Sequence, residues 1–200
     1  MIGVDEITQK LINSRKLGSL DCDFSVKDYE NISINDAYKI QKDIISGMNV
    51  SVSGWKLGGT NKKTRELLNV DELFWGPVFD GHILTNSNDI SLNSGEVEIA
   101  VKINKNIQDL DRDIHSNELS KYIDSVALSI EYPKSFIANF LDIGIEALIS
   151  DCCGSGQCLI GNEIAFLKFC DKLFMVEINS VMTEKLTTDT LIDGLYQTTC

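Results

Sequence analysis

The nine residues from Gly95 to Ile103 constrain the fold more than any other stretch of this chain. They read Gly-Glu-Val-Glu-Ile-Ala-Val-Lys-Ile, in which apolar residues at 97, 99, 101 and 103 alternate with Glu96, Glu98, Ala100 and Lys102. This period of two predicts a β-strand. Two carboxylates then share one face, about 7 Å apart at their α-carbons. Such a pair is either a solvated strand face, which is the commoner case, or part of a site for a divalent cation.

Composition limits the classes of function. The chain of 200 residues is 43% hydrophobic and 24% charged, as in ordinary globular proteins. Its 30 acidic against 18 basic side chains give a net charge of −12, so we expect no nucleic-acid or anionic membrane partner. The sequence has neither an apolar run of about 20 residues nor a secretory signal, which predicts a cytoplasmic protein. Six cysteines without a Cys-x-x-Cys pair, and only two histidines, disfavour zinc and predict reduced thiols.

The apolar spacing predicts a helical N-terminal part over residues 1–50 and a β-rich domain over 51–200. Helices are expected over 5–16, from the Ser33-x-x-Asp36 start to Gly47, over 116–123 and over 135–149. A short helix capped by Thr60 or Asn61 should bury Leu67 and Leu68. Strands are expected over 52–57, 78–84, 96–103, 125–132, 158–160, 164–169 and 173–178, with a turn at 154–156.

Two further residues are candidates for chemistry. Lys56 interrupts an apolar strand that runs into Gly58-Gly59; it is either a lysine that extends from a strand edge into water or a partly buried ammonium that binds a carboxylate or moves a proton. Glu131 ends a strand face otherwise made of the small residues Ser125, Ala127 and Ser129, which leaves room in front of it. Its carboxylate has the same two interpretations as the first pair.

Several motifs together resemble a known family. They are Asp-Ala-Tyr-Lys-Ile-Gln (36–41), Lys-Leu-Gly-Gly-Thr (56–60), Trp-Gly-Pro-Val-Phe (75–79), Glu-Val-Glu-Ile-Ala (96–100) and Leu-Ser-Ile-Glu (128–131). In this order they resemble the 2-keto-4-pentenoate hydratase and 2-oxo-3-hexenedioate decarboxylase branch of the fumarylacetoacetate hydrolase superfamily. The resemblance implies an α+β fold, a mixed β-roll-like domain behind a small helical N-terminal part, and an expected homo-oligomer.

The resemblance also implies a site. Carried over position by position, Glu96, Glu98 and Glu131 would bind Mg²⁺ or Mn²⁺, and hard cations do prefer oxygen ligands. A small 2-oxo acid would be hydrated or decarboxylated through a metal-stabilised enolate. Lys56 and Asp80 are the expected catalytic residues; Lys56, Thr60 and Ser155 are expected to contact the substrate.

Three departures from the family pattern keep a second hypothesis open. Either Asp80 substitutes for the family's acid/base aspartate with a shift of one residue, or that aspartate is missing. The family's Ala-Asp-Asn-Ala-Ser loop is replaced by Ser-Asp-Cys-Cys-Gly-Ser at 150–155. The sequence is also expected to be C-terminally short. The alternative to an enzyme is therefore a family remnant that acts as a binding or assembly subunit. Hydrolysis between two ketones ranks lowest, because the two histidines offer no obvious base.

Overall fold

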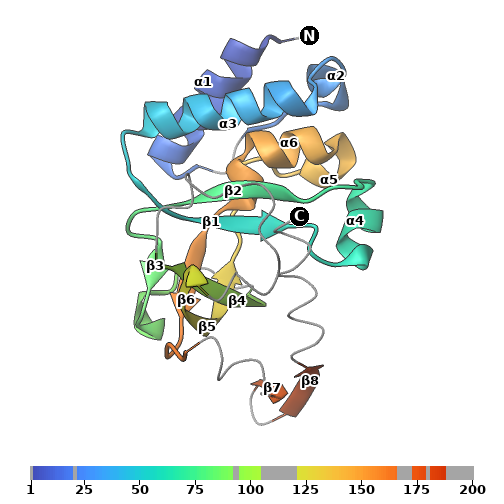
Figure 1. Cartoon of the computed structure of the whole chain (residues 1–200). Helices are drawn as coiled ribbons and strands as arrows, with labels where there is room; N and C mark the ends of the chain where they lie inside the picture. Colours follow the sequence, from blue (N-terminus) through green and yellow to red (C-terminus); the bar gives the residue numbers. More distant parts are fainter. Residues whose placement is uncertain are drawn as a thin grey trace. The chain divides into compact units, whose positions relative to one another are not determined.

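The computed structural model describes residues 2–19, 22–91, 95–104 and 121–165, and the backbone of 173–178 and 181–187. The chain divides into two compact units, one made of residues 1–96 and 131–159 and the other of 97–130 and 160–200. Figure 1 traces the elements of both units along the sequence. The predicted division at residue 50 stays a prediction, although the change from helix to strand does fall there.

Helices occupy the start of the first unit, as predicted. They are α1 (Val4–Leu17), the single turn α2 (Val26–Tyr29) and α3 (Ile34–Met48). Gly18, at φ 68°, ends α1 in the left-handed conformation that glycine adopts without strain. Ser33 and Asp36 form the predicted capping box: the Ser33 hydroxyl accepts from the Asp36 amide, and the Asp36 carboxylate accepts from the Ser33 amide. The turn α2 was not predicted, because one turn is too short to show a period.

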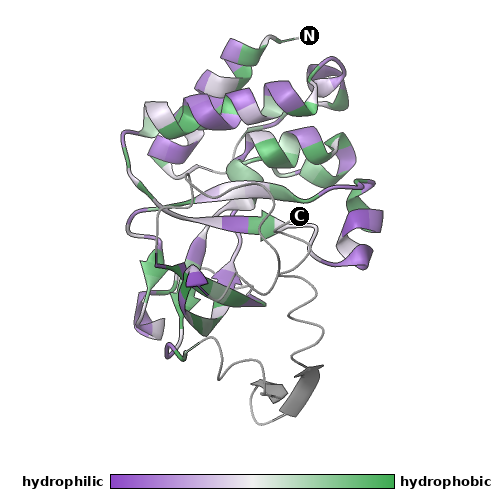
Figure 2. Ribbon diagram, viewed as in Figure 1, coloured by the Kyte–Doolittle hydropathy of each residue, from purple (hydrophilic) through white to green (hydrophobic). Residues whose placement is uncertain are grey.

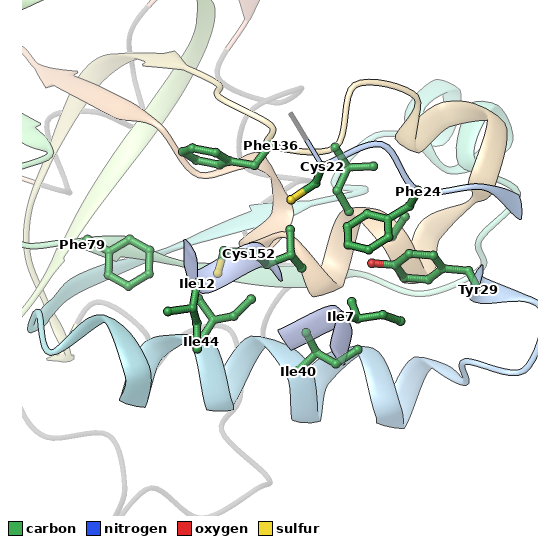
Figure 3. Close-up of a cluster of buried hydrophobic side chains, with 13 residues drawn as sticks. Ile7, Ile12, Cys22, Phe24, Tyr29, Ile40, Ile44, Phe79, Phe136 and Cys152 are labelled. Carbon is green, nitrogen blue, oxygen red and sulfur yellow. The ribbon is translucent and has the colours of Figure 1, made fainter. Parts of the chain in front are cut away.

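The largest core cluster lies between these helices and later parts of the same unit. Both helices are amphipathic in Figure 2, and Figure 3 shows Ile7 and Ile12 of α1 beside Ile40 and Ile44 of α3. The other buried members of the cluster are Leu11, Cys22, Phe24, Tyr29, Phe79, Phe136, Ile137, Ala147 and Cys152. Burying one such isoleucine contributes roughly 1.5–3 kcal/mol, so this contact fixes α1 and α3 on the unit.

A buried ion pair joins α1 to the residue after α6. The Arg15 guanidinium and the Asp151 carboxylate are 4% and 0% exposed, and Nη2 of Arg15 lies 2.7 Å from both Oδ1 and the backbone carbonyl of Asp151. The other carboxylate oxygen accepts from the Ser135 hydroxyl at 2.7 Å and from the amides of Phe136 and Ile137. Sequence reasoning missed this pair, because its members stand 136 positions apart.

Two antiparallel strands, β1 (Val52–Gly58) and β2 (Phe74–Phe79), form a ribbon in the first unit. The predicted short helix between them is α4 (Lys62–Leu68), with Asn61 as its cap through a bond to the Thr64 amide. Leu67 is 73% exposed, so its predicted burial was wrong. The helix has only two turns and buries no residue completely.

The predicted strand over 78–84 is in fact two strands. The chain turns at Gly81, at φ 81°, between β2 and the short β3 (Ile83–Leu84). A four-stranded sheet then has the order β3-β6-β5-β4, and β3 pairs with β6 in parallel. Its longer members are β4 (Glu96–Ile103), β5 (Ile123–Tyr132) and β6 (Gln157–Ile160). A 3₁₀ turn, η1 (Ser87–Asp89), follows β3.

The predicted helix over 135–149 is broken. Its described helical parts are α5 (Phe140–Ile143) and α6 (Ile145–Ser150), separated by Gly144 at φ 130°, a conformation that no helix contains. The predicted turn after them begins as the 3₁₀ turn η4 (Cys152–Gly154). Later in the chain, β7 (Leu173–Ile178) matches a predicted strand and pairs antiparallel with β8 (Val181–Thr187), which was not predicted.

The remaining predictions fall largely outside the described residues. Most of the expected helix over 116–123 does so, and Ile123 begins β5 instead. The expected strand over 164–169 is described only at its start, where Ile164 forms an isolated bridge with Val126. The architecture is a mixture of α-helices and mixed sheets. Among the described helices, none is long and apolar enough to cross a membrane.

Candidate metal and lysine site

Three carboxylates meet at the start of β4 and the end of β5. Glu96 and Glu98 stand two residues apart on β4 and therefore share one face. Glu131 comes from β5, the neighbouring strand in the sheet. One carboxylate oxygen from each residue lies within 4.8 Å of the others. The structure thus brings together the three residues that the sequence named as ligands.

The fourth residue of this site is Lys56. Its Nζ lies 2.6 Å from Oε1 of Glu131, and the two side chains are only 16% and 12% exposed. Alternation along β1 explains the placement: Lys56 points to the more buried side of the ribbon, whereas Trp55 and Leu57 point outward. Lys56 is therefore a partly buried, paired ammonium and not a lysine that extends from a strand edge into water.

Charge and burial oppose each other at Glu131. Burial raises the pKa of the Glu131 carboxyl above its ordinary value, because removal from water disfavours the ionised form. The nearby Lys56 ammonium lowers this pKa, and the Glu96 carboxylate raises it. The Lys56 ammonium therefore stabilises the ionised form of Glu131, whereas burial and the Glu96 carboxylate favour the neutral form.

The turn after α6 packs against β2 at Gly76, the residue that pairs with Lys56. Lys56 pairs across the ribbon with Gly76, where an added Cβ would meet the Cys152 carbonyl and lie 2.8 Å from the Cβ of Cys153. Cys152 and Cys153 both have left-handed backbones, at φ 53° and 54°, a conformation that costs non-glycine residues roughly 1–3 kcal/mol each. This close contact fixes the strand that lies opposite Lys56.

Cys153 and Gln41 hold that turn on β2. The Cys153 thiol donates to the Trp75 carbonyl over 3.0 Å, and Nε2 of Gln41 donates to the carbonyls of Trp75 and Ile149. Burial raises the pKa of the Cys153 thiol, and the positive charge of Lys56 opposes this rise, so the thiol stays neutral. In the sequence Gln41 stood out only as part of a motif, and no pattern indicated its contact with Trp75.

The other predicted site residues do not join this cluster. Asp80 follows β2: its amide donates to the Ser51 carbonyl, and its carboxylate accepts from the Ser53 hydroxyl. Ser53, which contacts the Asp80 carboxylate, precedes Lys56 on β1 by three residues, a separation of roughly 10 Å on an extended strand. Thr60 is half-buried in the turn between β1 and α4. No role for these two residues follows from the geometry.

Ser155 precedes a residue that packs against the end of β5. It is buried and donates its amide to the Cys152 carbonyl over 3.1 Å. The next residue, Gly156, packs against the carbonyl of Tyr132, which directly follows Glu131 on β5. The contact of Ser155 with a substrate stays a prediction.

The donor set fits a hard divalent cation. Carboxylate oxygens are the preferred ligands of Mg²⁺, Mn²⁺ and Ca²⁺, whereas thiols and imidazoles favour softer metals. The low exposure of Glu131 adds to the fit, because a buried carboxylate beside other acids needs a compensating positive charge. Lys56 supplies one such charge, and a cation bound by the three carboxylates would supply more.

The fold is similar to that of a decarboxylase known from solved structures. One such structure is 4-oxalocrotonate decarboxylase from Pseudomonas putida G7, complexed with magnesium and adipate: the TM-score is 0.74 at 16% identity, over 99% of this chain and 82% of that chain. The same protein complexed with calcium and acetate gives a TM-score of 0.71 at 15% identity, with the same coverage. The likeness confirms, at the level of the fold, the resemblance that the motifs indicated. It leaves the β-roll description open.

No family model matches the chain, and no curated protein matches it.

Proposed function

We propose that this protein is a divalent-metal-dependent lyase that acts on a small 2-oxo acid. The observation that carries the proposal is the cluster of Glu96, Glu98 and Glu131 with the Lys56 ammonium bound to Glu131. With a divalent ion bound to the three carboxylates and the Lys56 ammonium beside them, this would be a place where an anionic substrate can bind despite a net charge of −12. The fold neighbours support this choice, because their names describe a decarboxylase complexed with magnesium or calcium and with a carboxylate ligand.

In this proposal the three glutamates hold Mg²⁺ or Mn²⁺. When bound, the ion supplies Lewis-acid stabilisation of the negative charge that develops on the 2-oxo oxygen of the substrate. The role of Lys56 follows from its position: it is a cation of low exposure beside the cluster, able to bind the substrate carboxylate or to hold the proton that the product carbon takes up. Asp80 receives no step, because the ribbon carries it away from Lys56.

Two reactions are compatible with this chemistry. Decarboxylation breaks the bond between a carboxylate and its neighbouring carbon, releases CO₂ and leaves an enolate that is then protonated. Hydration adds water across a carbon–carbon double bond conjugated with the 2-oxo group. The names of the fold neighbours favour decarboxylation. A homo-oligomer also stays part of the proposal.

The test begins with protein freed of metal by EDTA. Addition of Mg²⁺ or Mn²⁺ is expected to restore turnover of an unsaturated 2-oxo dicarboxylic acid, measured as CO₂ release and as loss of substrate absorbance. Hydration would consume the substrate without CO₂. Glu96→Gln should lower metal affinity and turnover at least tenfold, by the loss of one ligand. The matched control is Glu66→Gln, an exposed glutamate of α4 paired with Lys62, which should change neither.

Two results would contradict the proposal. Unchanged metal affinity and turnover in Glu96→Gln would show that the cluster is not the metal site. Metal binding without turnover of any 2-oxo acid would favour the alternative, a binding or assembly subunit. The position of Asp80, which contacts Ser53 and not the Lys56–glutamate cluster, is the observation that favours this alternative.

A further inference from the structure

Lys56 contacts Oε1 of Glu131, and this contact has a consequence for the cation as well as for the substrate. Oε1 of Glu131 lies 2.6 Å from the ammonium, while the oxygen that each glutamate offers to a cation lies within 4.8 Å of the other two. A cation bound by these oxygens would therefore lie within a few ångströms of the Lys56 ammonium. At 16% exposure, water screens this charge less than it would screen one on the surface.

From this geometry we infer that Lys56 determines the charge of the cation that the three carboxylates prefer: its ammonium weakens the binding of trivalent ions more than that of divalent ions. This inference rests on the proposed metal site and adds a second role to a residue so far assigned to the substrate. The physical reason is Coulomb's law, under which repulsion from one fixed charge grows in proportion to the charge of the ion. A trivalent ion is therefore repelled half as strongly again as a divalent ion at the same place.

Lys56 also positions Glu131, and the test must separate this role from that of its charge. Loss of a hydrogen-bond partner of a metal ligand typically costs tenfold to a hundredfold in affinity. That loss would affect Ca²⁺ and Tb³⁺ alike, since these ions are similar in their preference for oxygen. The ratio of the two affinities therefore reports the charge of residue 56 and cancels its positioning role.

The experiment measures Ca²⁺ by calorimetry and Tb³⁺ by luminescence titration, without substrate, for the wild-type protein, Lys56→Gln and Lys56→Met. The glutamine keeps a donor toward Glu131 without charge, and the methionine removes both. We expect the ratio of Tb³⁺ to Ca²⁺ affinity to rise roughly tenfold or more in both variants. The matched control is Lys62→Gln, which removes the same charge from a lysine that is 83% exposed and also paired with a glutamate. In this control the ratio should change by less than about twofold, because the charge is screened.

Each outcome has one meaning. A ratio that rises in both Lys56 variants and not in the control supports the inference. A ratio that stays constant while both ions still bind, including an equal fall in both affinities, would show that Lys56 only orients Glu131; the proposed function would be unaffected. Absence of any Ca²⁺ or Tb³⁺ binding to the wild-type protein would overturn the metal site and with it the proposed function. Circular dichroism of each variant verifies that it is folded before titration.

Discussion

Replacement of Arg15 by methionine should be among the most destabilising single changes in the first unit. The guanidinium is 4% exposed and the Asp151 carboxylate is fully buried, so the variant would leave an ionised carboxylate in the core without its counter-charge. Removing one partner of a buried ion pair typically costs about 3–5 kcal/mol. The three remaining donors to Asp151, from residues 135–137, satisfy one oxygen only. We therefore expect a loss in this range.

The loss should depend on pH with a definite sign. Burial raises the pKa of the Asp151 carboxyl, and the Arg15 charge opposes this rise, so removing the charge raises the pKa further. A carboxyl whose pKa is raised by folding destabilises the folded state increasingly as the pH rises from the ordinary aspartate value, near 3.9, through the raised value. The difference between wild type and Arg15→Met should therefore be smallest in acid, widen as the pH rises, and level off above the raised pKa.

The assay is urea unfolding followed by tryptophan fluorescence. Both tryptophans of the chain, Trp55 and Trp75, lie on the ribbon of the first unit, which also contains Arg15 and Asp151. The double variant Arg15→Met/Asp151→Asn removes both charges and should be more stable than the sum of the single losses predicts. A loss below about 1 kcal/mol, a loss independent of pH, or strict additivity would each refute the reasoning.

Three further predictions concern separate features. Gly76→Ala should lower the free energy of unfolding by about 1–3 kcal/mol, since its Cβ would overlap the turn after α6; Gly54→Ala, on the neighbouring strand with nothing within 4 Å, should have little effect, and equal losses would argue against the close contact. Ser33→Ala should cost about 1 kcal/mol at neutral pH. The Ser33 hydroxyl and amide lower the pKa of Asp36, so the share of this stabilisation that comes from the Asp36 carboxylate should be present above the ordinary aspartate pKa and be lost as the pH falls through the lowered value, as unfolding at several pH values will show. Glu131→Gln should reduce Ca²⁺ affinity at least tenfold in calorimetry, and retained affinity would exclude this residue as a ligand.

Local patterns gave much of the secondary structure, because these elements depend on neighbours in the sequence. The capping box of α3, the glycine that ends α1 and the alternation of β4 can each be read within about ten residues. The errors also have local causes. Gly81 and Gly144 adopt positive φ angles that divide a predicted strand and a predicted helix, and the sequence does not show which glycines will do so.

The sequence by itself named the chemical groups of the site. Glu96, Glu98, Glu131 and Lys56 were identified from strand alternation and motif order, because a period of two shows which residues share a face. Their grouping was an implication of a resemblance, whose fold the solved decarboxylase structures confirm. The sequence did not show which of the three carboxylates contacts the Lys56 ammonium.

Tertiary structure decided those contacts. Strand pairing places Gly76 opposite Lys56 and separates Asp80 from it, and packing brings Arg15 to Asp151 across 136 positions. Local periodicity contains no information on such distances, because burial and strand register are set by the whole fold. The sequence thus determined that two carboxylates share one face of β4, and only the fold determined that Glu131 joins them and contacts the Lys56 ammonium.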